Sequence, residues 1–158
     1  MQKRFILTCG LAVVSLAAAA CGGTTPSTGS ASPAAGSMTT ISVADNPKLG
    51  KILVDGSGKT LYLFEADKST ASTCYGDCAS YWPPVLTASA PDAGTGVNAS
   101  LLGTSQRKDG TKQVTYAGHP LYYVVTDHKA GDTTGHGVSN FGALWWVLSP
   151  SGAAITTK

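Results

Sequence analysis

The chain has 158 residues, of which 11 are basic and nine are acidic, and its formal net charge is +2. This length suits one domain. Removal of the first 20 residues takes away Lys3 and Arg4 and leaves nine basic residues against nine acidic ones. A near-neutral chain lacks the basic surface that nucleic acids and polyphosphates require, so we exclude those partners.

The first 20 residues have the features of a secretory signal peptide. Lys3 and Arg4 form a short basic region, residues 5–16 are apolar, and residues 17–20 are four alanines that suit cleavage. The apolar run is shorter than the roughly 20 residues that a transmembrane helix needs. We therefore predict that residues 1–20 are a signal peptide that is removed on export.

Cys21 follows these alanines directly and precedes two glycines. The arrangement resembles the bacterial lipoprotein box, whose cysteine is lipidated and becomes the mature N-terminus, although Ala18 stands where the box favours leucine. The resemblance implies an exported chain anchored to the outer face of the bacterial cell membrane or to the envelope, because two or more acyl chains anchor stably. The alternative is a plain secreted protein in which Cys21 has no such role.

Residues 22–40 carry no charge, and Met38 is their one large apolar side chain. Such a segment buries too little surface to offset the entropy lost on ordering. We therefore predict that residues 21–40 are a lipidated cysteine followed by a disordered tether, with an r.m.s. reach of roughly 25 Å. The β-rich domain then occupies residues 41–158.

The first half of this domain, about residues 41–100, contains short β-branched runs at 41–43 and 51–54. A turn at 55–58 leads to a strand at 60–64, so we predict a hairpin across this turn. Apolar residues alternate onto both faces of 60–64, which predicts a strand covered on both sides. One helical turn is expected at 79–82, before Pro83, and a second after Asn98, whose side chain is a suitable cap.

The second half, about residues 101–158, repeats this plan. Strands at 105–108 and 111–116 flank Asp109-Gly110, a strong two-residue hairpin signal. A strand at 120–125, a Gly-rich loop at 130–137, a buried strand at 144–148 and an edge strand at 153–155 follow. No stretch has long helical periodicity. We predict an all-β, mostly antiparallel domain with one or two short helical turns.

Several residues recur 60 positions apart, which predicts two pseudo-repeats in one compact domain. The matching pairs are Tyr62 and Tyr122, Asp67 and Asp127, Leu61 and Leu121, Gly58 and Gly118, and Val54 and Val114.

The motif Tyr-x-aromatic-x-x-Asp is formed by Tyr62, Phe64 and Asp67, and two cysteines precede a Trp-Pro-Pro stop at 82–84. In the second copy Val124 replaces the aromatic residue, while Tyr122 and Asp127 remain. Together with the run from Asp109-Gly-Thr to Leu-Tyr-Tyr, these features resemble a family of bacterial secreted-repeat lipoproteins whose function is uncharacterised. The resemblance implies no established activity.

Cys74 and Cys78 are expected to form a disulfide in an exported protein. A disulfide needs Cβ atoms about 3.8 Å apart, whereas neighbours on successive helical turns lie about 5–6 Å apart. The bond therefore requires a bent turn, for which Gly76 is well placed.

The alternative is a copper or thiol-redox site, because two thiolates and an imidazole suit copper. The third ligand would come from one of three histidines: His119, His128 and His136.

Asp67 and Asp127 are interpreted as structural acids, because a carboxylate just after a strand can accept N–H groups of the following loop. An acid–base pair is the alternative. A calcium site at Asp127 and Asp132 would lack the dense acidic loop that calcium needs. Trp145 and Trp146 point to opposite faces of their strand, so one of them is a candidate contact for a carbohydrate, a quinone or a protein surface.

Residues 131–137 do not open a helix and therefore form no phosphate cradle, and no serine-hydrolase elbow has its strand–turn–helix context. The sequence therefore predicts a non-catalytic binding or structural module without a cofactor, tied to the membrane through its lipid and facing an envelope protein or surface ligand. The alternative function is a copper-binding or thiol-redox accessory protein that uses Cys74, Cys78 and a histidine.

Overall fold

The computed structural model describes residues 38–157. The predicted signal peptide, the predicted lipidation site at Cys21 and most of the predicted tether lie outside these residues. Within the described range, no helix has the length and apolar character needed to cross a membrane.

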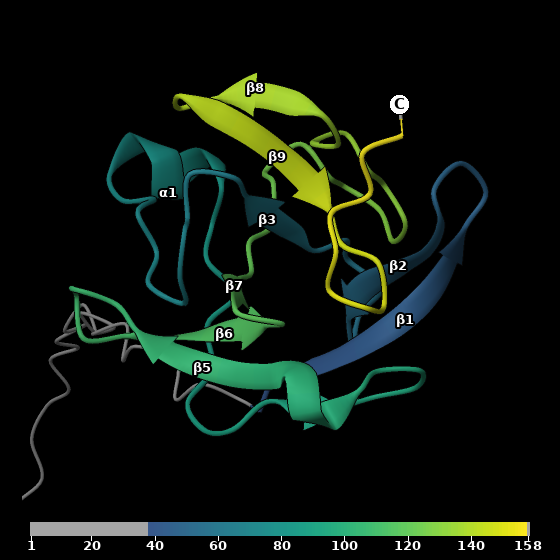
Figure 1. Ribbon diagram of the computed structural model, residues 1–158, viewed down its shortest axis with the longest axis horizontal. Coiled ribbons are helices and arrows are strands. Elements are labelled where there is room, and N and C mark those ends of the chain that lie inside the picture. The colour runs from purple at the N-terminus through teal and green to yellow at the C-terminus, as the bar shows by residue number, and fades with distance from the viewer. Residues whose placement is uncertain (1–37, 158) are drawn as a thin grey trace, which may run out of the picture. The chain divides into compact units, whose positions relative to one another are not determined.

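The described residues form nine strands, one α-helix and one 3-10 helix (Figure 1). In chain order these are β1 (Thr40–Asn46), β2 (Gly50–Asp55), β3 (Tyr62–Phe64), α1 (Asp77–Tyr81), β4 (Asp92–Ala93), the 3-10 helix Ala99–Leu101, β5 (Leu102–Gln106), β6 (Lys112–Tyr116), β7 (His119–Pro120), β8 (Val138–Asn140) and β9 (Ala143–Val147). The predicted mostly antiparallel all-β class is confirmed.

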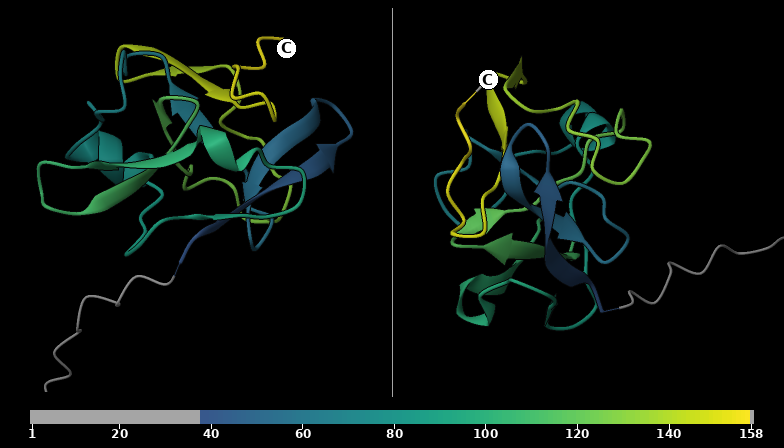
Figure 2. Two further views of the ribbon diagram at one scale, coloured as in Figure 1. Left: turned by 60° about the horizontal axis from the view of Figure 1, so that its bottom comes forward. Right: turned by 90° about the vertical axis from the view of Figure 1, so that its right-hand side faces the viewer.

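The strands form three small sheets, in the orders β2-β1-β4, β5-β6-β7 and β3-β9-β8. The hairpins β1–β2 and β5–β6 lie on opposite sides of the domain (Figure 2, left). The third sheet takes β3 from the first half of the chain and β8 and β9 from the second. The two halves therefore share a sheet rather than folding side by side.

The predicted hairpin between residues 51–54 and 60–64 is wrong beyond its turn. The turn itself forms, because Asp55 Oδ1 accepts from the N–H groups of Ser57 at 2.8 Å and Lys59 at 2.9 Å. After a single bridge between Val54 and Thr60, β3 leaves β2 and pairs with β9. A strand with apolar residues on both faces is buried more fully there, between two layers of side chains.

The hairpin of β5 and β6 is confirmed, but its loop has three residues rather than two. Arg107 N–H donates to Thr111 O at 2.8 Å and so closes a loop over residues 108–110. Gly110 takes the left-handed conformation that this loop needs, with φ +82°. The predicted strand 120–125 is regular only in β7, and Tyr122 then forms isolated bridges to Tyr62 and Pro84.

The backbone hydrogen bonds show which residues of the two halves are equivalent. They move one of the pairs found in the sequence by one residue. Leu53 N–H donates to a backbone carbonyl near the end of the second half, and Leu53 C=O accepts from Leu61 N–H. Val114 makes the corresponding pair of bonds, the second with Leu121. Leu53, not Val54, is therefore the counterpart of Val114, because the turn of the first half is one residue longer than that of the second.

The core consists of two clusters on the two faces of β3. Tyr62 and Phe64 belong to the first cluster, which also holds Trp82, Trp145 and the cysteines. Leu61 and Leu63 belong to the second. The prediction that this strand is covered on both sides is confirmed.

Both predicted helical turns are present. Helix α1 begins slightly earlier than expected, at Asp77, and ends before Pro83. The Asn98 side chain accepts a hydrogen bond from Ser100 N–H at 3.0 Å and caps the 3-10 helix. The predicted edge strand at 153–155 is a single bridge between Leu148 and Ala154.

Candidate functional site

The repeated motif forms two crossed Tyr–Asp pairs, in which each tyrosine reaches the aspartate of the other repeat. Tyr62 Oη donates to Asp127 Oδ2 at 2.7 Å, and Tyr122 Oη donates to Asp67 Oδ2 at 2.6 Å. The backbones of the two tyrosines also bond each other, with N–O distances of 2.9 and 3.0 Å. The crossing lies in the buried core, where the two repeats meet.

Each aspartate also holds the loop that follows it. Asp67 Oδ1 accepts from the N–H of Thr73 at 2.7 Å and from its hydroxyl at 2.6 Å. Asp127 Oδ1 accepts from the same two groups of Thr134, at 2.9 and 2.6 Å. Both oxygens of each carboxylate are therefore engaged, which is the structural arrangement expected for an acid just after a strand.

The crossed pairs change the acidity of the phenols. Burial, reinforced by the hydrogen bond to Asp127, raises the pKa of Tyr62 far above its ordinary value of 10.0. Burial and the bond to Asp67 likewise raise the pKa of Tyr122. Both tyrosines therefore act as hydrogen-bond donors in the folded chain, not as bases.

Aromatic rings fill the space between the two pairs. Trp82 and Trp145 stack with their centroids 3.9 Å apart and their planes within 2°, and Phe64 stacks on Trp145 at 4.0 Å. Tyr62 meets Trp82 edge-on at 5.4 Å, and Tyr122 meets Trp145 edge-on at 5.1 Å. This arrangement is a packed core.

The hypothesis that Trp145 or Trp146 is an exposed contact is wrong. Their side chains do point to opposite faces, but they enter the two core clusters and are 0% and 4% exposed. Trp146 Nε1 donates to Glu65 Oε1 at 2.8 Å. Both faces of β9 are covered, so neither ring is available to a ligand.

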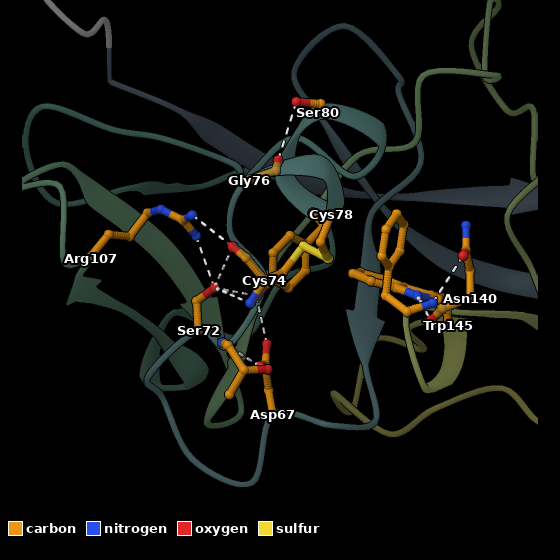
Figure 3. Close-up of a disulfide and its surroundings, with 12 residues drawn as sticks. Asp67, Ser72, Cys74, Gly76, Cys78, Ser80, Arg107, Asn140 and Trp145 are labelled. Atoms are coloured by element: carbon orange, nitrogen blue, oxygen red, sulfur yellow. Dashed lines mark hydrogen bonds between the residues drawn. A yellow bond between two sulfur atoms is a disulfide. The ribbon is translucent and has the colours of Figure 1, made fainter.

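The sulfurs of Cys74 and Cys78 are at bonding distance, 1.95 Å, with their Cα atoms 5.3 Å apart (Figure 3). The predicted bent turn occurs at Gly76, which has φ +57° and immediately precedes α1. The disulfide lies against the aromatic core rather than at an open surface.

Arg107 is a buried residue that sequence reasoning missed. It is 4% exposed, and its guanidinium donates to Ser72 Oγ at 2.9 Å, Cys74 O at 2.8 Å and Gln113 Oε1 at 2.7 Å. Figure 3 shows it reaching the cysteine loop from the hairpin of the other repeat. An arginine beside a polar turn is normally exposed, so no local signal reveals this contact.

The histidines lie in separate surroundings. His136 Nε2 bonds Thr157 O at 2.8 Å, His128 is exposed on the loop held by Asp132, and His119 belongs to β7. Within residues 38–157, no group of three His, Cys, Asp or Glu side chains is arranged to hold a metal ion. The proposed combination of Cys74, Cys78 and a histidine is therefore not brought together there.

An open groove lies beside the crossing, with a volume of about 900 Å³. Residues 63–65 and 67–70 of the first repeat line it, together with 117–119 of the second and Ala154. Its lining combines apolar side chains with Glu65, Lys68 and His119. Both repeats therefore contribute to the groove.

The sequence model of a family described as a secreted repeat of unknown function matches the chain twice, over residues 43–86 and 103–149. The chain belongs to this family. The two matches coincide with the two halves that cross in the structure, so each secreted repeat supplies one tyrosine and one aspartate to the crossed pairs. No curated protein and no solved structure matches the chain.

Proposed function

We propose that the chain is an exported module of the bacterial cell envelope, anchored to the membrane by lipid on Cys21, that binds a surface ligand or envelope protein without chemically changing it. Its membership of a family of secreted repeats supports export. The run from basic residues through alanines to Cys21 supports the anchor. The proposal assigns it no cofactor.

The observation that carries the binding role is the groove between the repeats. Pockets that combine apolar side chains with a few polar groups are typical of ligand sites. The motif carboxylates, of which Asp67 lines the groove, are bonded to tyrosines and to their own loops. Groups engaged in this way support the fold, which favours a binding role over acid–base catalysis.

The anchor is tested by fractionating bacteria that express the full chain. We expect the wild-type protein in the membrane fraction, carrying fatty acid at its mature N-terminus. The variant Cys21→Ala should be released in soluble form. Equal fractionation of the two proteins would contradict the lipid anchor.

The groove is tested by NMR titration of the full chain with a soluble oligosaccharide and a water-soluble quinone. We expect shifts at residues 63–70 and 117–119 with at least one of them. Ser69→Trp, which fills the groove, should abolish these shifts, whereas the exposed control Ser151→Trp should keep them. Shifts that persist in Ser69→Trp, or turnover of a probe, would contradict the proposal.

A further inference from the structure

The two hairpins of the domain, β1–β2 and β5–β6, are equivalent, but only one has its outer edge covered by described residues. Leu53 and Val114 are counterparts, and they lie opposite Val43 and Thr104 respectively. Val43 therefore corresponds to Thr104, and Ile41, two residues before Val43, corresponds to Leu102.

The outer edge of β1 is covered by residues 92–95, which run parallel to it. Gly94 N–H donates to Ile41 O at 2.7 Å, and Val43 N–H donates to Thr95 O at 2.9 Å. These bonds satisfy Ile41 O and Val43 N–H on the side of β1 away from β2.

The outer edge of β5 has no such cover among residues 38–157. Along β5, the backbone groups of successive residues point alternately toward β6 and away from it. Arg107 N–H donates to Thr111 O, and Leu101 O accepts from Ala117 N–H, so residues 101 and 107 point toward β6. By that alternation, Leu102 O and Thr104 N–H point away from β6. In Figure 1, β6 lies between β5 and β7, so the opposite side of β5 is the sheet edge.

The composition of β5 suits strand addition. Native proteins usually protect a free edge with charged residues, proline or a bulge. The sequence Leu-Gly-Thr-Ser-Gln has no charged residue and no proline, and Thr104 and Gln106 are exposed. Leu102 O and Thr104 N–H are the counterparts of the two groups that β1 uses, Ile41 O and Val43 N–H.

We propose that the outer edge of β5 binds an extended segment of a partner polypeptide, rich in small residues, which adds as a parallel strand. The covering segment of β1, with the sequence Asp-Ala-Gly-Thr, indicates the chemistry of this partner. The site is separate from the groove, because it lies on the far side of β6 from β7.

The edge of β5 is more open than that of β1. A Cβ atom on Gly94 would lie 2.1 Å from Ser42 Oγ and 2.9 Å from the backbone oxygen of Ile41, so the cover of β1 must be glycine at this point. Gly103 stands where β1 has Ser42, and it has no side chain to exclude a neighbour. A partner segment on β5 therefore meets no serine side chain, but Leu102 O, the counterpart of Ile41 O, still favours glycine at this position of the partner.

The test is an NMR titration of the ¹⁵N-labelled full chain with a peptide of the sequence of residues 91–97. We expect shifts along β5 and slower exchange of the Thr104 amide proton. Thr104→Pro removes this N–H at an edge position where proline is tolerated, and it should weaken binding at least tenfold. Thr104→Val keeps the N–H and should bind as the wild type does.

A second peptide tests the site without altering the protein, in case the proline variant does not fold. N-methylation of the glycine at the Gly94 position removes the N–H that Leu102 O would accept and should also weaken binding at least tenfold. Equal binding of both peptides, shifts confined to the groove, or no shifts at millimolar peptide would overturn the proposal.

Sedimentation velocity on the full chain separates a partner polypeptide from a second copy. We expect a monomer over the range of concentrations used in the titration. Self-association that Thr104→Pro abolishes would assign the edge to another copy of this chain and overturn the partner proposal. Neither measurement depends on lipidation or on the groove, so a failure here leaves those two proposals to their own tests.

Discussion

The two repeats bring equivalent tryptophans to the same stack by different local structures. In the first repeat, Trp82 directly follows helix α1 and the disulfide loop. In the second, Trp145 lies on β9, just after the tight turn from β8. Each ring meets the motif tyrosine of its own repeat edge-on. The stack and the crossing are thus common to both halves, while the segment that leads to them is not.

The difference has a steric cause at one position. Thr73 and Thr134 hold equivalent places beside the motif aspartates, so Cys74 corresponds to Gly135. A Cβ atom at Gly135 would lie 2.6 Å from Cη2 of Trp82. The ring of Trp82 therefore leaves no room for a cysteine in the second repeat, and only the first can have this disulfide.

The largest expected effect comes from breaking the shared stack. Trp82→Ala and Trp145→Ala should each lower the free energy of unfolding by about 3–5 kcal/mol, the usual cost of removing a large buried ring. The loss for Trp145→Ala should lie at the upper end of this range, since Trp145 stacks on two rings and donates to Asn140 O. Urea unfolding measures both, with the partly exposed Tyr81→Ala as control. A loss no greater than that of the control would contradict the shared core.

The crossed pairs should contribute equally in the two directions. Tyr62→Phe and Tyr122→Phe each remove a bond to a carboxylate, worth about 1.5–3 kcal/mol. Their unfolding free energies in urea should fall by similar amounts, and the double variant should test whether the pairs are coupled. If only one of the two single variants loses stability, the Tyr–Asp pair of the other variant does not support the crossing.

The pH dependence follows from the raised pKa values of these two phenols. A phenol whose folded pKa lies above its unfolded value of 10.0 contributes stability that is fully present below pH 10 and is lost as the pH rises above it. Wild-type unfolding free energy should therefore fall above pH 10. The unfolding free energy of the double variant Tyr62→Phe, Tyr122→Phe should fall less steeply with pH. Parallel curves of unfolding free energy against pH would contradict this origin.

Removing the disulfide should affect the first repeat alone. The double variant Cys74→Ser, Cys78→Ser should lose about 2 kcal/mol, the chain-entropy value for so short a loop. Amide exchange should accelerate at Ser80, whose N–H bonds Gly76 O at 3.0 Å, and stay unchanged on β9. Reduced wild-type protein is the matched control. Equal acceleration of amide exchange in both repeats would show that the disulfide supports the whole domain.

The smallest expected effect is a gain at the turn of the second repeat. Phe141 has φ +54° and is 43% exposed, so its strained backbone is not offset by burial. Phe141→Asn should raise the melting temperature by an amount equivalent to about 1 kcal/mol, because asparagine tolerates this conformation. Phe141→Ala retains the strain and should change little. A loss of stability in Phe141→Asn would mean that the ring is needed in place.

Local chemistry determined the class of this fold and much of its outline. Strand alternation, the Asn98 cap and the bend at Gly76 depend on neighbours in sequence, and the 60-residue repetition is visible in the sequence itself. Each of these features appears in the structure. The candidate motif residues were also visible, because they recur as a set. Their partners were not: Tyr62 bonds Asp127, 65 positions away.

Tertiary structure alone decided the pairings between the repeats. Whether β3 stays with β2 or joins β9 depends on which arrangement buries both of its apolar faces, and a local pattern cannot distinguish the two. The burial of Arg107 is likewise decided by tertiary structure, because its acceptors at Ser72 and Cys74 belong to the other repeat and reach it only in the folded domain. Burial and polar satisfaction are properties of the assembled core, so no single segment of the sequence contains them.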